Sequence, residues 1–189
     1  MRNGKTTRVR RTCTVGLTQG LHIRPVQRLA DIATAFRSEI RIATADREAL
    51  VDSVMALMAL GIRPQQEVEI QSEGEDANQT ARAIQILVEN EILLEADEQI
   101  HAAPAEAQFW EAVARLADVF DSEVGLRGEE CSFSLTVPNC RKFSDYSGMQ
   151  WDVRAAGPDA EQASEVVSKL LSWVGLLGSV RGVRHATPA

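Results

Sequence analysis

Polar and apolar residues alternate over several short stretches of the first half of the chain, a pattern typical of strands with one buried face. The clearest are "RVRRTCTVGLTQ" (8–19), "SEIRIAT" (38–44) and "EVEIQSEG" (67–74). From Pro25 the period becomes that of an amphipathic helix, and its apolar stripe is Val26, Leu29, Ile32, Ala33 and Phe36. "DSVMALMALG" (52–61) predicts a short helix that stops at Gly61, and "EDANQTARAIQILVEN" (75–90) predicts a longer one.

The turn residues of "ATADREAL" (43–50) complete the order β-α-β-β-α-β-α, which predicts an α+β sandwich with helices on one face of a sheet.

The pattern then repeats in the second half of the chain. "ADIATAFRSEI" (30–40) aligns with "ARLADVFDSEV" (114–124) at an offset of 84. "EVEIQSEGEDANQTARAIQILV" (67–88) aligns with "QWDVRAAGPDAEQASEVVSKLL" (150–171) at an offset of 83. We therefore expect two tandem copies of one small domain, over 1–92 and 105–189, joined by an acidic linker within 94–108.

The second copy departs from the first in places. We expect its long helices at about 107–121 and 158–175, and strands in 131–137 and 148–157. Pro138 and Asn139 fall where the middle helix should be, so we expect that helix to be lost. The tail "VRGVRH" (180–185) could replace the weak first strand. Three tryptophans (Trp110, Trp151 and Trp173) predict a bulky core or a face against the first copy.

Composition and charge remove several classes of function. The net charge of −7 over 189 residues, with a pI of about 5.1, argues against nucleic-acid binding. No apolar run is long enough to span a membrane, and the basic start (1–11) is expected to be a solvated leader rather than a signal peptide. Three cysteines match no zinc or disulfide framework, which favours a reducing cytoplasm.

The candidate chemistry lies in "GLHIRP" (20–25), where His22 precedes a helix and Arg24 follows it closely. The first N–H groups of a helix lack intrahelical acceptors and, with the helix dipole, form an anion site. An imidazole there could carry a phosphoryl group whose oxygens face these amides and the Arg24 guanidinium. No carboxylate or second histidine lies nearby in sequence, so we expect neither a metal nor a cofactor. The plainer alternative is a cap or surface histidine.

"GLHIRP", "DSVMALMALG" and "EVEIQSEGEDA" together resemble the histidine-containing phosphocarrier (HPr) family over about residues 8–90. The resemblance implies an open-faced β-sandwich of four antiparallel strands and three helices. It also implies a stoichiometric carrier rather than an enzyme. His22 would accept a phosphoryl group from enzyme I, itself charged by phosphoenolpyruvate, and pass it to a histidine of an acceptor such as an enzyme IIA domain. Arg24 would stabilise the phosphate. Ile23 stands where the family usually has alanine.

Ser53 matches a second phosphorylation site of some HPr proteins, so the resemblance implies regulation by a serine kinase. The alternative is a helix cap worth about 1 kcal/mol. "VMALMAL" (54–60) has no polar face, so part of it should reach the surface. In the resemblance this is where enzyme I and acceptor domains bind, and burial against the second copy is the alternative. The docking candidates are Val54, Met55, Leu57 and Met58.

The second copy has no matching site. The offset of 84 places Glu106 opposite His22 and Gln108 opposite Arg24, so we expect a degenerate copy that carries no phosphate. His101 is interpreted as a linker residue and His185 as a surface residue. Two functions stay open: a sugar-transport phosphocarrier, or a regulatory module whose partners change when His22 or Ser53 is phosphorylated.

Overall fold

The computed structural model describes residues 7–97, 103–146 and 149–184. The chain divides into two compact units, residues 1–95 and 96–189. No helix in the described ranges is long and apolar enough to cross a membrane.

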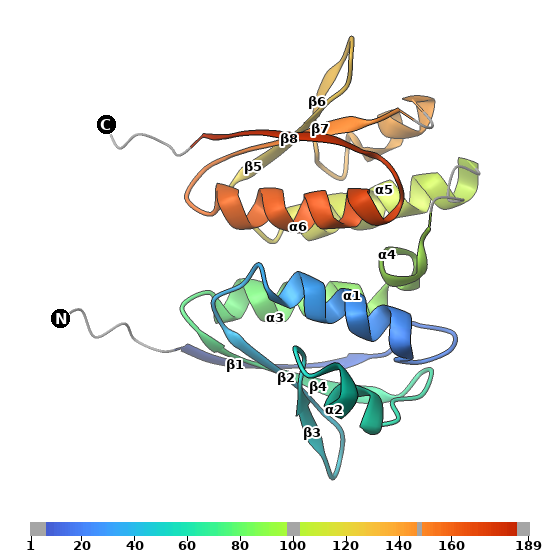
Figure 1. Cartoon of the computed structure of the whole chain (residues 1–189), viewed down its shortest axis with the longest axis vertical. Coiled ribbons are helices and arrows are strands. Elements are labelled where there is room, and N and C mark those ends of the chain that lie inside the picture. Colours follow the sequence, from blue (N-terminus) through green and yellow to red (C-terminus); the bar gives the residue numbers. More distant parts are fainter. Residues whose placement is uncertain (1–6, 98–102, 147–148, 185–189) are drawn as a thin grey trace, which may run out of the picture. The chain divides into compact units, whose positions relative to one another are not determined.

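Unit 1 has the predicted order of elements, followed by one extra helix. Its four strands form one antiparallel sheet in the order β1-β4-β2-β3. Helices α1 and α3 lie along one face of this sheet (Figure 1), and α2 packs against α1 and β3. The elements are β1 (Thr7–Thr14), α1 (Ile23–Ala33), β2 (Glu39–Ala43), β3 (Glu48–Leu50), α2 (Val54–Ala59), β4 (Glu67–Gly74), α3 (Ala77–Glu89) and α4 (Glu91–Glu95).

The core of unit 1 follows from the two periods seen in the sequence. Val68 and Ile70 of β4 and Ile40 and Ile42 of β2 alternate with exposed or half-exposed residues and point to the helices. The stripe of α1 is buried at Val26, Leu29 and Ile32. The opposite face of the sheet carries exposed ion pairs, such as that of Arg8 with Glu73. The α+β prediction for this unit is confirmed.

Unit 2 is also a sheet covered by helices, and α5 and α6 lie on one face of it (Figure 1). The sheet order is β6-β5-β7-β8. Rings in its core include Trp110, Phe143 and Trp151, whereas Trp173 is half-exposed. The elements are α5 (Ala103–Ala117), β5 (Glu123–Arg127), β6 (Ser132–Ser134), the 3-10 helix η1 (Cys140–Tyr146), β7 (Trp151–Ala156), α6 (Ala160–Trp173) and β8 (Leu177–Arg184).

The predicted linker of 94–108 contains the boundary between the two units, but its bounds were too wide. Its first two residues end α4, and α5 begins at Ala103 rather than near 107. The reason is that "APAEAQ" contains three alanines, one glutamate and one glutamine, which favour helix, and that Pro104 is tolerated in the first turn. The predicted loss of a middle helix was incomplete, because η1 occupies that stretch after Pro138.

The strand-to-helix joints of the two units share one hydrogen-bond arrangement. The Asp76 carboxylate, just before α3, accepts from the Arg37 backbone N–H at 2.9 Å. In unit 2 the Asp159 carboxylate, just before α6, accepts from the Asp121 N–H at 2.9 Å. A Cβ on Gly74 or Gly157 would lie within 3 Å of the serine that follows this N–H donor. Each joint therefore has an aspartate at the N-cap position, whose side chain makes no capping hydrogen bond, and a close glycine–serine approach.

Candidate functional site

His22 is the N-cap residue of α1, with an extended backbone. The loop that delivers it depends on Gly20, whose φ of 68° is left-handed and whose added Cβ would lie 2.3 Å from the Ile62 carbonyl oxygen. The Leu21 N–H donates to the same carbonyl at 3.1 Å. The histidine is thus fixed at the helix start by the backbone before it.

The start of α1 has the features of an anion site. The first helical bond of this turn runs from the Val26 N–H to the His22 carbonyl at 3.1 Å, so the amides of Ile23 and Arg24 precede it. Pro25 has no N–H to leave unpaired there. The Arg24 side chain is 53% exposed and the His22 side chain 32% exposed, which leaves both accessible to a partner.

No local pattern predicted a carboxylate at this histidine, but the fold brings one there. Glu95, the last residue of α4, places its Oε1 atom 2.6 Å from Nε2 of His22. Its Oε2 atom lies 4.0 Å from Nη1 of Arg24, beyond hydrogen-bond distance. Glu95 is the site residue that the sequence analysis missed.

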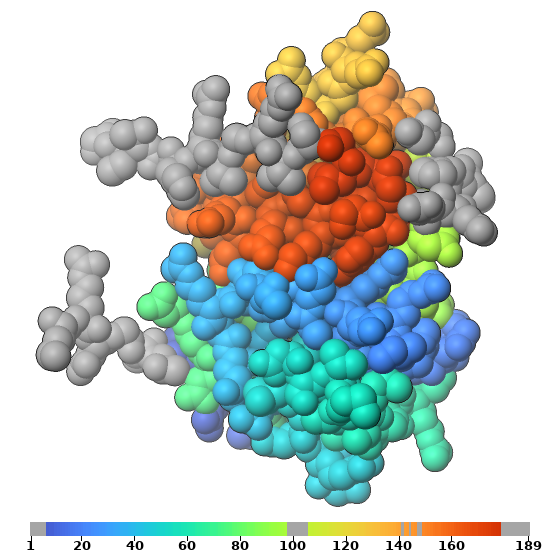
Figure 2. All heavy atoms as spheres, in the orientation of Figure 1, coloured from blue at the N-terminus to red at the C-terminus, as the bar shows by residue number. Residues whose placement is uncertain are grey.

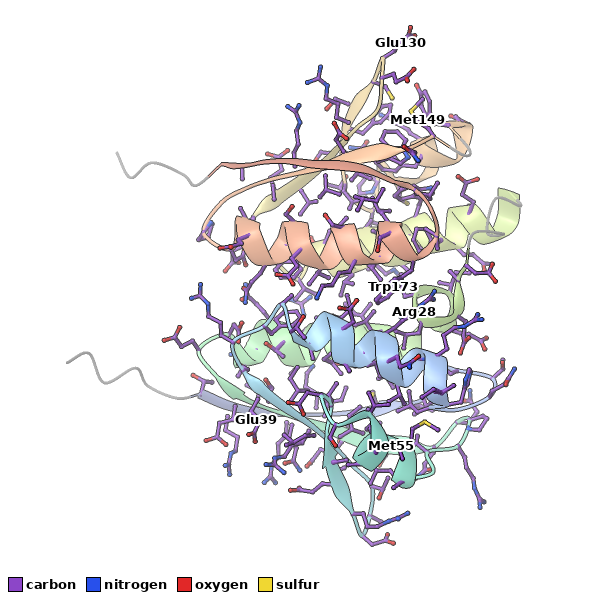
Figure 3. All side chains as sticks on the ribbon, in the orientation of Figure 1. Arg28, Glu39, Met55, Glu130, Met149 and Trp173 are labelled. Carbon is purple, nitrogen blue, oxygen red and sulfur yellow. The ribbon has the colours of Figure 1, made fainter. Side chains whose placement is uncertain are left out.

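Helix α2 lies beside α1 at the surface of unit 1 (Figure 2). Met55, labelled in Figure 3, is 80% exposed. Ile23 at the start of α1 is 48% exposed, while Val54 and Met58 are half-buried. Leu57 is completely buried, so its place among the docking candidates was wrong. It points into the core because it lies on the opposite side of the helix from Met55.

Ser53 is the N-cap residue of α2, yet its side chain makes no capping hydrogen bond. Its hydroxyl therefore does not contribute the stabilisation expected of a capping serine. The serine is half-buried and lies beside the exposed Asp52.

Glu106 of unit 2, which the sequence offset of 84 aligns with His22, has a different environment. Glu106 lies inside α5 rather than at a helix start, because this helix begins earlier than α1 does at the same offset. It is 1% exposed, and its Oε2 atom has no hydrogen-bond partner. Gln108 is exposed and uncharged. His101 and His185 lie outside the described residues. Within the described ranges no group of three or more potential metal ligands occurs.

Comparison with known proteins agrees with this geometry. The sequence profile "PTS HPr component phosphorylation site" matches residues 9–90. The phosphocarrier protein HPr of Mycoplasma capricolum is 40% identical over 65 residues, which are 34% of this chain and 73% of the relative. That of Haloferax volcanii is 32% identical over 77 residues, which are 40% of this chain and 86% of the relative. The crystal structure of HPr from Bacillus anthracis is 28% identical, covers 43% of this chain and 98% of its own, and has a TM-score of 0.42.

The class that these matches define is the phosphocarrier, a protein that carries a phosphoryl group and is not an enzyme. The chain belongs to the HPr family, through residues 9–90. Helix α4, which contributes Glu95, follows the matched range, and so does the whole of unit 2.

Proposed function

We propose that the chain is a phosphocarrier of the phosphotransferase system. His22 accepts a phosphoryl group from enzyme I and passes it to an acceptor histidine, such as that of an enzyme IIA domain. The observation that carries this proposal is the position of His22 at the N-cap of α1, with Arg24 two residues later, inside the region that matches the family.

The chemistry follows from that position. A phosphoryl group on a ring nitrogen of His22 would place its oxygens near the amides that open α1, at the positive end of the helix dipole. The Arg24 guanidinium adds planar, charge-assisted donors to the same oxygens. These donors stabilise the phosphoryl group on His22, and the N–P bond can still be broken, as a relay between two partners requires.

The partner surface that we propose combines the exposed apolar residues next to the site. Ile23 and Met55 are the most exposed of them, and Val54 and Met58 complete the patch. Methionine side chains adapt to different surfaces, which suits a carrier that must meet both a donor and an acceptor. Enzyme I and the acceptor domain would bind here in turn.

The test is intact mass spectrometry after incubation with phosphoenolpyruvate and enzyme I. One phosphate should appear and should be lost in mild acid, because phosphohistidine is acid-labile and phosphoserine is not. His22→Ala should abolish this label, while His101→Ala should keep it. Labelling that survives in His22→Ala would contradict the proposal.

For Ser53 we propose regulation by a serine kinase, supported by a hydroxyl that is not used for capping. A phosphate dianion beside the apolar patch would be costly to desolvate against a partner. Ser53→Asp should therefore slow the enzyme I-dependent labelling of His22, whereas Ser53→Ala should leave its rate unchanged. Equal rates for wild type and Ser53→Asp would argue against regulation at this residue.

For unit 2 we propose a degenerate HPr-like copy without a phosphate. Strands β2 and β5 begin at Glu39 and Glu123, 84 residues apart, and the caps Asp76 and Asp159 are 83 apart, which supports this relation. The second candidate function is a regulatory module whose binding changes when His22 or Ser53 is phosphorylated. Rapid discharge onto an enzyme IIA domain would support the relay, and persistent phosphate would support the module.

The proposed compartment is the reducing cytoplasm, consistent with three free cysteines.

A further inference from the structure

Helix α4 is seated on unit 1 by several independent contacts, although it lies beyond the family match. Its first residue, Glu91, accepts hydrogen bonds from the Thr18 N–H at 2.9 Å and from the Thr18 hydroxyl. Nη1 of Arg28 donates to the Leu94 carbonyl at 2.9 Å, and Figure 3 shows this arginine beside the helix. Leu93 and Leu94 are buried. The position of Glu95 is therefore set by packing and hydrogen bonds at both ends of α4.

The contact between Glu95 and His22 defines where the ring proton lies. A carboxylate can only accept hydrogen bonds, so the 2.6 Å separation of Oε1 and Nε2 requires the proton on Nε2. In a neutral imidazole the other nitrogen then carries the lone pair. Nδ1 of His22 is thus the nucleophilic nitrogen while Glu95 is in place.

We propose that Glu95 is a positioning residue for phosphoryl transfer, an inference that rests on the proposed function of His22. By holding Nε2–H it fixes both the ring orientation and the tautomer that exposes Nδ1. A carboxylate has the same role toward histidine in triads of the Ser-His-Asp type. Because Oε2 stays 4.0 Å from Arg24, the guanidinium donors remain available for the phosphoryl oxygens.

The transfer step balances with these groups alone. The Nδ1 lone pair forms the new N–P bond as the N–P bond of phosphorylated enzyme I breaks, and that electron pair leaves with the donor's nitrogen. The His22 ring becomes positively charged, the proton stays on Nε2, and the Glu95 carboxylate offsets the charge. When the group moves on, the N–P bond electrons return to Nδ1 and the ring is again neutral.

The test compares Glu95→Ala and Glu95→Gln with Glu75→Gln in the full chain. Glu75→Gln is the matched control, because it removes the charge of an exposed carboxylate of the same unit that pairs with Arg37 instead of His22. In the unphosphorylated protein, nitrogen-15 NMR should detect a slowly exchanging Nε2–H of His22 in wild type and control, and lose it in Glu95→Ala. Loss of a charge-assisted hydrogen bond should slow labelling of His22 by enzyme I roughly 10- to 100-fold. Glu95→Gln, which keeps an acceptor without the charge, should fall between.

The two readouts separate the two proposals. If wild type takes no acid-labile phosphate, the proposed function fails and the role of Glu95 fails with it. If wild type is labelled and Glu95→Ala is labelled at the same rate, or keeps the protected Nε2–H, only the role of Glu95 is overturned. A Glu95→Ala variant that loses native circular dichroism is replaced by Glu95→Gln, for which an unchanged rate and pH profile would overturn the proposal.

Discussion

At the scale of single residues, His22 and Arg24 perform separable tasks. His22 is held by the backbone of its loop, whereas Arg24 extends from the first turn of α1 and is half-exposed. Oε2 of Glu95 lies 4.0 Å from Nη1 of Arg24, too far for a hydrogen bond. Arg24 is therefore expected to contribute to transfer much more than to stability.

Arg24→Ala should slow phosphorylation of His22 by roughly 10- to 100-fold, the range for a lost hydrogen bond to a charged group. Its midpoint of thermal unfolding should stay within a degree or so of wild type, since exposed substitutions change stability little. Arg37→Ala, in the loop between α1 and β2 and ion-paired with the exposed Glu75, is the control. Equal rates for the two variants would exclude a role in transfer.

Cys13 offers a pH-dependent measurement of the core of unit 1. Burial, with a smaller effect of the Glu89 carboxylate, raises the pKa of its thiol from the ordinary 9.0 to about 12. The neutral thiol thus contributes stability that is complete below pH 9 and is lost as the pH rises toward 12, because the unfolded chain ionises first. Urea unfolding between pH 8 and 11 should show a steeper loss for wild type than for Cys13→Ala. Parallel curves would contradict this.

At the scale of elements, helix α2 has two faces with opposite roles. Leu57 is buried in the core, and Met55 is 80% exposed. Leu57→Ala should lower the free energy of unfolding by about 2–5 kcal/mol, as for other buried leucines. Met55→Lys should leave stability nearly unchanged and weaken labelling by enzyme I through a higher apparent KM. If Met55→Lys is labelled like wild type, the docking surface lies elsewhere.

Helices and strands were predictable where the hydrophobic period repeated over many residues or where the turn residues were clear. The stripe that begins at Val26 and the alternation in β4 predicted α1 and its sheet correctly, although Phe36 lies beyond the end of the helix at Ala33. Helix α4 was missed because five residues contain barely more than one turn, too few for a period to be visible. Its role depends on the contact of Glu95 with His22, residues far apart in the chain, which no local pattern can indicate. The start of α5 was missed because no turn or stop residue marks the point where the linker ends and "APAEAQ" begins the helix.

At the scale of the whole molecule, unit 1 contains a complete sheet and site once α4 is included. A fragment of residues 1–97 should therefore unfold cooperatively in urea. A fragment of residues 1–90 lacks Leu93 and Leu94, two buried side chains that should each contribute about 1.5–3 kcal/mol as an upper bound. The shorter fragment should be the less stable by several kcal/mol, and equal midpoints would show that α4 adds nothing to the core.

The direction of β8 has a consequence for the ancestry of unit 2. In unit 1 the outer strand β1 runs antiparallel to β4, whereas β8 runs parallel to β7 beside it. Circular permutation changes the order of segments in the chain but keeps the direction of every strand in the sheet. Strand β8 is therefore not a permuted β1. Under the proposed relation between the units, the place of the missing first strand was filled by a new segment, which turned β7, α6 and β8 into a βαβ unit.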